Sequence, residues 1–242
     1  MLYVITASHI TSPKRFDYLC MCINSVKVVA PNAIHLISTY ATCDIWEKKG
    51  NNIDGVEVTI QNHVMTQFEH IRYLLCNNNF QLEDMIMFLD DDDLLLDIPE
   101  EISKGLPISS LQWLPLRHED IDGSKEYYLA DFRDNQHNLS QWDQVCDFSG
   151  YCLSYKDMLG YSTPANAIAS MEDLELMNYI DKLPLMKKIE YPYIFHRCHN
   201  EMGEGSKWMQ DVTNELRTLV GNMQLNSVDF EQILEVFLNK DI

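Results

Sequence analysis

The feature of this sequence that most constrains its fold is a short apolar run that ends in four carboxylates. Residues 85–89 read Met-Ile-Met-Phe-Leu, and four aspartates, Asp90 to Asp93, follow directly. Uninterrupted hydrophobicity over the length of a strand predicts a strand that is buried on both faces, as in the centre of an α/β sheet. Ligands of such sheets bind beyond the carboxyl ends of the strands. Because adjacent carboxylates repel one another, we expect a metal ion or another cationic partner to neutralise them there.

The four aspartates have two interpretations. If the chain stays extended, Asp90 and Asp92 face one side while Asp91 and Asp93 face the other, so that one pair can meet a metal together. The alternative is a solvated acidic turn, which is the commoner role of a charge run. The buried strand before the run favours the metal site.

The apolar patterns of the chain predict alternating strands and helices. Strands are predicted over 2–6, 34–38, 56–60 and 85–89, and helices over 16–26 and 65–76. This β-α-β-β-α-β order indicates an α/β fold with a Rossmann-like mixed sheet, a parallel core and flanking helices. Two more strands are predicted over 111–116 and 127–132, and helical spacing after Ser227 predicts a C-terminal amphipathic helix.

The charge and the apolar windows exclude several classes of protein. Eighteen Lys and Arg against 37 Asp and Glu give a net charge of −19, which repels phosphate backbones, so nucleic acid is not an expected partner. The sequence shows neither a membrane-spanning window nor a secretion signal, so we expect a protein with no integral membrane segment and a cytoplasmic location. The seven cysteines lack zinc-site spacing and are expected to be reduced thiols.

Three segments together resemble the GT-A glycosyltransferases, in particular the inverting family 2. The strand that runs into residues 89–93 is similar to that family's Leu-Asp-x-Asp-Asp signature. Residues 171–176, Met-Glu-Asp-Leu-Glu-Leu, resemble its Glu-Asp motif at the start of a helix. Residues 195–200, Phe-His-Arg-Cys-His-Asn, resemble a Tyr-Arg-x-His segment that closes over the donor.

The resemblance implies a domain organisation and a reaction. A GT-A domain over 1–208 would comprise a nucleotide-sugar-binding half (1–98) and an acceptor-binding half (99–208), followed by a helical tail (209–242). The implied activity moves a sugar, with inversion, from a UDP- or GDP-linked donor to a hydroxyl of a glycan, protein or small-molecule acceptor.

A departing nucleoside diphosphate needs positive charge beside it, which in an acidic protein requires a divalent cation. Asp92, with Asp90, is the expected metal contact, and carboxylate ligands favour Mg²⁺ or Mn²⁺. An imidazole ligand would favour Mn²⁺, with His199 the better candidate and His196 the next. Because the residues around them look extended, only one of these two histidines is expected to reach the metal.

Inversion requires a base on the side of the sugar opposite the leaving diphosphate. Asp173 is the expected base, and Glu172 is expected to bind acceptor hydroxyls. Both residues lie at an expected helix amino terminus, where the helix dipole favours carboxylates, so the alternative is a purely stabilising role.

The resemblance places Thr6, Ala7 and Ser8, at the end of the first strand, beside the nucleoside. The family's second strand ends in paired aspartates, whereas this chain has Thr39 and Tyr40. Tyr40 is expected either to stack on the base or to pack in the core.

Further donor contacts are expected from Asp90, Asp91 and Arg72. Of these, Arg72 lies near an arginine of the family pattern. On the acceptor side, Gly150 is expected to let the backbone approach the substrate. Tyr151 is expected either to stack on a sugar face or to pack in the core.

Two other functions stay open. Clustered aspartates after a strand also serve metal-dependent nucleotidyl or phosphoryl transfer. The unusual Thr39-Tyr40 pair is compatible with an inactive sugar-nucleotide-binding module of the same fold. The joint presence of Asp92, Asp173 and His199 favours the glycosyltransferase.

Overall fold

The computed structural model of the chain describes residues 1–42, 56–109, 113–119, 125–131, 149–161, 176, 179–180, 182–189 and 193–198. The predicted helical tail, residues 209–242, lies outside these ranges. Within them, no helix combines the length and the hydrophobicity that crossing a membrane requires.

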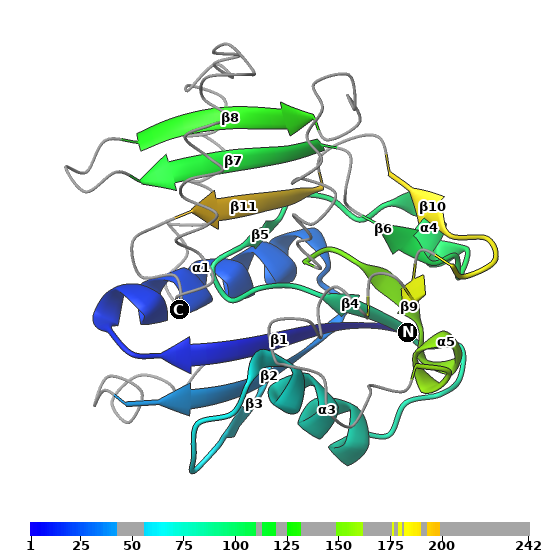
Figure 1. Cartoon of the computed structure of the whole chain (residues 1–242), viewed down its shortest axis with the longest axis horizontal. Coiled ribbons are helices and arrows are strands. Elements are labelled where there is room, and N and C mark those ends of the chain that lie inside the picture. Colours follow the sequence, from blue (N-terminus) through cyan, green and yellow to red (C-terminus); the bar gives the residue numbers. More distant parts are fainter. Residues whose placement is uncertain are drawn as a thin grey trace.

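A seven-stranded mixed sheet forms the base of the fold, with the strand order β10-β6-β9-β4-β1-β2-β3 (Figure 1). Its strands are β1 (Leu2–Ile10), β2 (Ile34–Ala41), β3 (Val56–Ile60), β4 (Met85–Phe88), β6 (Ile108–Ser109), β9 (Cys152–Ser154) and β10 (Lys187–Lys188). The first four run parallel to one another, whereas β9 is antiparallel to β4. The predicted mixed sheet with a parallel core is therefore confirmed.

A second, four-stranded sheet has the order β5-β11-β7-β8. Its strands are β5 (Leu94–Leu95), β7 (Trp113–Glu119), β8 (Lys125–Asp131) and β11 (Ile194–Cys198). β7 and β8 are the two strands predicted over 111–116 and 127–132, and they pair antiparallel. Helix α1 (Pro13–Val29) lies between the two sheets (Figure 1), where its Tyr18 and Met21 pack against Leu94 and Phe195.

Local sequence signals set the ends of the two long helices. Helix α1 begins after Ser12, whose Oγ accepts a hydrogen bond from the backbone N–H of Arg15 at 3.2 Å. Helix α3 (Gln67–Asn77) begins with a capping box. Thr66 Oγ1 accepts from the Glu69 N–H at 3.2 Å, and the Glu69 carboxylate accepts from the Thr66 N–H at 2.7 Å. Two short helices, α4 (Glu100–Ser103) and α5 (Tyr155–Leu159), complete the described set.

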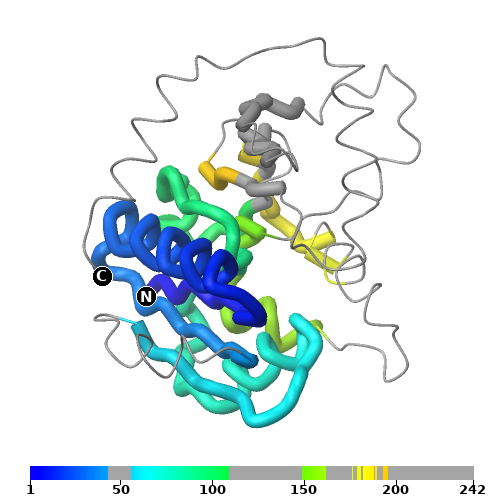
Figure 2. The backbone as a smooth tube through the Cα atoms, turned by 90° about the vertical axis from the view of Figure 1, so that its left-hand side faces the viewer, coloured from blue at the N-terminus to red at the C-terminus, as the bar shows by residue number. Residues whose placement is uncertain are grey.

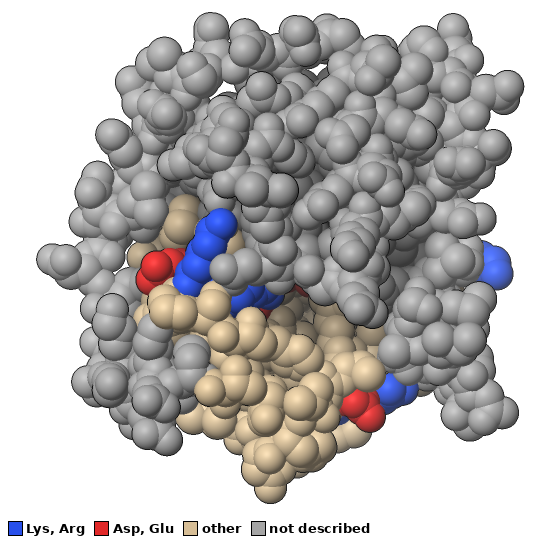
Figure 3. Space-filling model, turned by 60° about the vertical axis from the view of Figure 1, so that its left-hand side comes forward, with Lys and Arg blue, Asp and Glu red and all other residues tan. Residues whose placement is uncertain are grey.

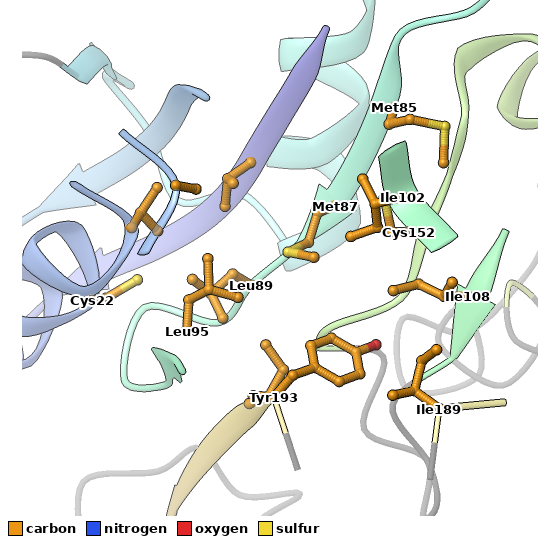
Figure 4. Close-up of a cluster of buried hydrophobic side chains, with 14 residues drawn as sticks. Cys22, Met85, Met87, Leu89, Leu95, Ile102, Ile108, Cys152, Ile189 and Tyr193 are labelled. Atoms are coloured by element: carbon orange, nitrogen blue, oxygen red, sulfur yellow. The ribbon is translucent and has the colours of Figure 1, made fainter. Parts of the chain in front are cut away.

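Strand β4 buries both of its faces, as the apolar run predicted. Figures 1 and 2 show α1 and α3 on opposite sides of β1. On the α1 side, Met85 and Met87 pack with Leu89 in one cluster (Figure 4), and on the α3 side Ile86 and Phe88 pack in another. Burial of each such side chain stabilises the fold by about 1.5–3 kcal/mol. The aspartates therefore follow a strand that is fixed from both sides.

Candidate active site

The four aspartates form a turn at the carboxyl end of β4. The backbone N–H of Asp93 donates to the carbonyl of Asp90 at 3.2 Å, and Asp91, Asp92 and Asp93 are buried. The chain therefore does not stay extended, and the expected alternation of Asp90 and Asp92 against Asp91 and Asp93 is not present. We refer to Asp90–Asp93 as the carboxylate turn.

Side chains from three separate segments hold the carboxylate turn. Ser8 of β1 donates its hydroxyl to Asp91 Oδ2 at 2.6 Å. Gln67 at the start of α3 donates its amide Nε2 to Asp90 Oδ1 at 2.6 Å. Ser149, before β9, accepts through Oγ from the backbone N–H of Asp90 at 3.2 Å. The turn is thus fixed against β1, α3 and the segment that leads into β9.

A cation from α1 completes the arrangement. Arg15 donates through Nη1 to Asp92 Oδ2 at 2.9 Å and through Nη2 to Asp91 Oδ1. The side chains of Arg15, Asp91 and Asp92 are only 13%, 5% and 8% exposed. The expected cationic partner of the aspartates is therefore present as a guanidinium. Figure 3 shows basic and acidic side chains next to each other at the border of the described surface.

The electrostatics of this ion pair follow from burial and proximity. Burial opposes the charge of Arg15, but the carboxylates of Asp91 and Asp92 outweigh burial and raise the pKa of the guanidinium. Burial raises the pKa of Asp91, and the charge of Asp92 adds to the shift while Arg15 opposes it. When Asp91 and Asp92 are both ionised, the single guanidinium of Arg15 neutralises only one of the two charges, and the group of three keeps an excess of negative charge.

The segment before β9 reaches the turn through a glycine. Gly150 has a φ of 87°, a left-handed conformation that disfavours side chains. Its N–H donates to Phe88 O at 2.6 Å, which brings the neighbouring Ser149 against the turn. Tyr151 is fully buried in the core, so of its two interpretations the packing role is confirmed.

Thr6, Ala7 and Ser8, which are expected to bind the nucleoside, lie inside β1, because this strand continues to Ile10 and does not end at Thr6 as predicted. Tyr40 lies near the carboxyl end of β2. In the parallel register Ala7 pairs with Ser38 and Ser8 with Thr39. Ala7 is half-buried, whereas Ser8 is buried and engaged with the carboxylate turn. Thr6 is fully buried, and its hydroxyl contacts His35 Nε2 at 2.9 Å. Its contact with a nucleoside stays a prediction.

Two histidines beside this edge were not identified from the sequence. His9 Nε2 and His70 Nε2 lie 3.1 Å apart, and His70 Nδ1 lies 2.8 Å from Ser38 Oγ. Burial, with a contribution from His9, lowers the pKa of His70 to about 4. Tyr40 is half-buried, and its ring meets that of His9 edge to face at 6.3 Å between centroids. His9 and His70 are 61 residues apart, so no local signal joined them.

Arg72 occupies a different place from the carboxylate turn. It is exposed on α3 and lines a cavity of about 440 Å³ beside α5. The other lining residues are largely apolar or aromatic: Phe68, Ile71, Leu75, Cys76, Asn78, Tyr155, Met158, Leu159 and Tyr161. The predicted contact of Arg72 with a diphosphate stays a prediction.

Three predicted site residues, Glu172, Asp173 and His199, lie outside the described residues. Their roles therefore stay predictions. His196 belongs to β11, where it pairs with Leu116 of β7, in agreement with the extended segment predicted around the two histidines.

The carboxylate turn fits a hard divalent cation by the chemistry of its donor atoms. Within the described residues, no three His, Cys, Asp or Glu side chains are grouped so that they could hold a metal by themselves. Mg²⁺ sites commonly use one or two carboxylates and complete their coordination with substrate phosphates and water. The excess negative charge beside Asp92 suits such a cation. That Asp92 and Asp90 would hold it stays a prediction.

Sequence reasoning identified the aspartates but missed the side chains that position them. Arg15, Gln67 and Ser149 lie between 23 and 77 residues from their partners in the turn. The one available signal was an arginine at the start of a helix in a chain of net charge −19.

Comparisons with solved structures place this geometry in a known fold. The match to S. aureus TarS covers 98% of this chain and 43% of the TarS chain, with a TM-score of 0.53 and 14% sequence identity. The match to GalNAc-T7, solved with UDP, GalNAc and Mn²⁺, covers 85% of this chain and 44% of the GalNAc-T7 chain, with a TM-score of 0.58 and 12% sequence identity. This chain thus spans less than half the length of either protein.

A shorter form of TarS, residues 1–349 in complex with UDP-GlcNAc, matches 99% of this chain over 72% of its own, with a TM-score of 0.50 and 11% identity. No protein-family profile and no curated protein sequence matches this chain. The fold resemblance therefore extends across nearly the whole chain at low sequence identity. The protein has a GT-A-like glycosyltransferase fold.

Proposed function

We propose that this protein is a metal-dependent glycosyltransferase that moves a sugar from a nucleoside diphosphate sugar to an acceptor hydroxyl with inversion. The observation that carries the proposal is the buried carboxylate turn, held at the carboxyl end of a central parallel strand of a GT-A-like fold. Ligands of parallel sheets bind at this edge. The neighbours solved with UDP and with UDP-GlcNAc support a uridine nucleotide as the first donor to test.

The donor would lie across the ends of β1, β2 and β4. Ala7, Ser8 and Tyr40 border the nucleoside side of this edge, and the carboxylate turn borders the diphosphate side. A bound Mn²⁺ or Mg²⁺ would supply positive charge for the leaving diphosphate. Asp92 and Asp90 would hold the cation, with His199 as the proposed third ligand.

Residues of the acceptor-binding half (99–208) would take the proton from the acceptor hydroxyl. We assign Asp173 as the base that takes the proton from the attacking hydroxyl and Glu172 as a group that binds acceptor hydroxyls. Displacement of the diphosphate by that hydroxyl, on the opposite face of the sugar, gives inversion in a single step.

The test of this function has two stages. First, melting temperature is measured with UDP, GDP and their sugar conjugates, each in Mn²⁺, Mg²⁺ or chelator, because a ligand that binds the folded state raises it. Second, the conjugate that gives a metal-dependent shift is incubated with acceptor hydroxyls, and release of the nucleoside diphosphate is measured. Release of pyrophosphate instead would indicate a nucleotidyltransferase.

Two substitutions separate the proposed roles. Asp92→Asn is expected to abolish the metal-dependent shift, whereas Asp173→Asn is expected to keep it and to lower turnover by about 10²- to 10⁴-fold. Asp97→Asn, which removes an exposed carboxylate just after the turn, is the matched control. An Asp92→Asn protein that shows the same metal-dependent shift as the control would refute the metal assignment.

A further inference from the structure

Arg15 contacts the carboxylate of Asp92, the residue that is proposed as the principal metal ligand. Its two terminal nitrogens contact two different carboxylates, Asp91 and Asp92, instead of both oxygens of one. The Nη1 contact is on Asp92 Oδ2, an oxygen of the residue proposed as the principal metal ligand. The cation that the aspartates require is thus supplied, in part, by the chain itself.

The position of Arg15 is fixed by the fold. Its backbone N–H is bound by the Ser12 cap, so the residue lies in the first turn of α1. The following apolar residues, Phe16 and Leu19, are buried against Ile37 of the large sheet. The helix therefore holds the base of the Arg15 side chain beside the carboxylate turn, and the guanidinium end of the side chain makes the contacts with Asp91 and Asp92.

The guanidinium of Arg15 and a divalent cation would compete for the same negative charge, the carboxylate of Asp92. A metal bound to Asp92 would lie within a few ångströms of Nη1, and two cations at that separation in a buried site repel each other strongly. Arg15 would have to leave Asp92 for the metal to bind. The diphosphate of a donor carries negative charge and is the partner that the released guanidinium would then meet, because guanidinium groups match phosphate oxygens.

We propose that Arg15 is an internal counter-cation that competes with the divalent metal for Asp92, and that this competition couples metal binding to nucleotide binding. The metal half of the proposal depends only on the carboxylate turn, and the nucleotide half rests on the proposed function. In the free protein Arg15 keeps metal affinity low. In the presence of a nucleoside diphosphate the guanidinium moves to the phosphates and the metal binds more tightly.

The test measures Mn²⁺ affinity by calorimetry and by the electron paramagnetic resonance signal of free Mn²⁺, in the absence and in the presence of UDP. Arg15→Met keeps the length of the side chain and removes its charge. We expect this variant to bind Mn²⁺ alone at least about tenfold more tightly than the wild type. We also expect the factor by which UDP raises Mn²⁺ affinity to be at least about tenfold smaller in the variant.

Lys14→Met is the matched control, because it removes the same charge from the neighbouring, exposed residue of α1. Equal Mn²⁺ affinity in Arg15→Met, Lys14→Met and the wild type would overturn the proposal, as would an unchanged coupling factor in proteins that bind UDP. A higher Mn²⁺ affinity in both variants would also overturn it, since the effect would then be one of net charge. If Arg15→Met does not fold, Arg15→Gln replaces it, because this substitution also removes the positive charge and keeps an amide that can donate to a carboxylate.

Failure of this proposal and failure of the proposed function give different results. If Arg15→Met binds Mn²⁺ more tightly but no nucleotide or nucleotide sugar binds any form of the protein, the counter-cation stands and the transferase is refuted. If the wild type transfers sugar but Arg15→Met has unchanged Mn²⁺ affinity and coupling, the transferase stands and the counter-cation is refuted.

Discussion

His35 is expected to make the stability of the fold depend on pH. It is 2% exposed on β2, its Nε2 contacts the Thr6 hydroxyl, and its Nδ1 has no hydrogen-bond partner among the described residues. Burial, with a smaller contribution from the charge of Lys27, lowers its pKa from 6.5 to about 3. The folded protein thus keeps His35 neutral at pH values where the unfolded chain protonates it.

The sign and the size of the effect follow from linkage. Because the folded pKa lies below the unfolded pKa, the contribution is fully present above pH 6.5 and is lost as pH falls from there toward 3. At pH 5 a histidine with a pKa of 6.5 favours its protonated form about thirtyfold, which corresponds to a loss of about 2 kcal/mol of unfolding free energy. This loss is a large fraction of the total for a protein of ordinary stability.

Urea unfolding at pH 8 and pH 5, followed by tryptophan fluorescence, measures this loss. His35→Gln removes the titrating group and keeps an amide that can meet Thr6. Carboxylates and other groups titrate equally in both proteins, so the wild type is expected to lose about 2 kcal/mol more than His35→Gln between the two pH values. His63→Gln, at an exposed histidine, is the control and should behave as the wild type. Equal losses in the wild type and His35→Gln would refute the reasoning.

Two further substitutions test how the fold holds the site. Thr66→Ala removes the capping box of α3 and should lower the unfolding free energy by about 1 kcal/mol, measured by urea unfolding; an unchanged midpoint would contradict the cap. Gly150→Ala forces a side chain onto a backbone with a φ of 87°, which should cost about 1–2 kcal/mol. That cost should appear as a melting temperature lower by several degrees, and an unaltered melting curve would show that the strain is absent.

Local signals in the sequence were sufficient for the parallel half of the fold. The uninterrupted apolar run before Asp90 identified β4, and the apolar pattern over 65–76 predicted α3 close to its bounds, Gln67–Asn77. Strands β5, β6 and β10 contain two residues each, too few for any periodic pattern. Their pairing, which adds β6 and β10 to the large sheet and β5 to the second sheet, depends on tertiary contacts that no short window contains.

The candidate site, too, could be predicted from the sequence only in part. The aspartates are contiguous, so their concentration of charge was visible in the sequence. The direction of each side chain was not, because the alternation assumed an extended chain and the Asp93–Asp90 hydrogen bond closes a turn instead. Arg15 could not be assigned to the site, since only the docking of α1 brings it to Asp91 and Asp92.

The contacts that hold the carboxylate turn also bear on how the protein folds. Ser8 and Asp91 are 83 residues apart, Arg15 and Asp92 are 77 apart, and Ser149 and Asp90 are 59 apart. Bringing such distant segments together costs chain entropy before any contact compensates for it, so we expect these contacts to form late in folding. A refolding chain should therefore gain its helices and its apolar core before it can bind a cation. After dilution from urea, Mn²⁺ binding should therefore recover later than the circular dichroism signal of the helices, and its recovery would report the last step of folding.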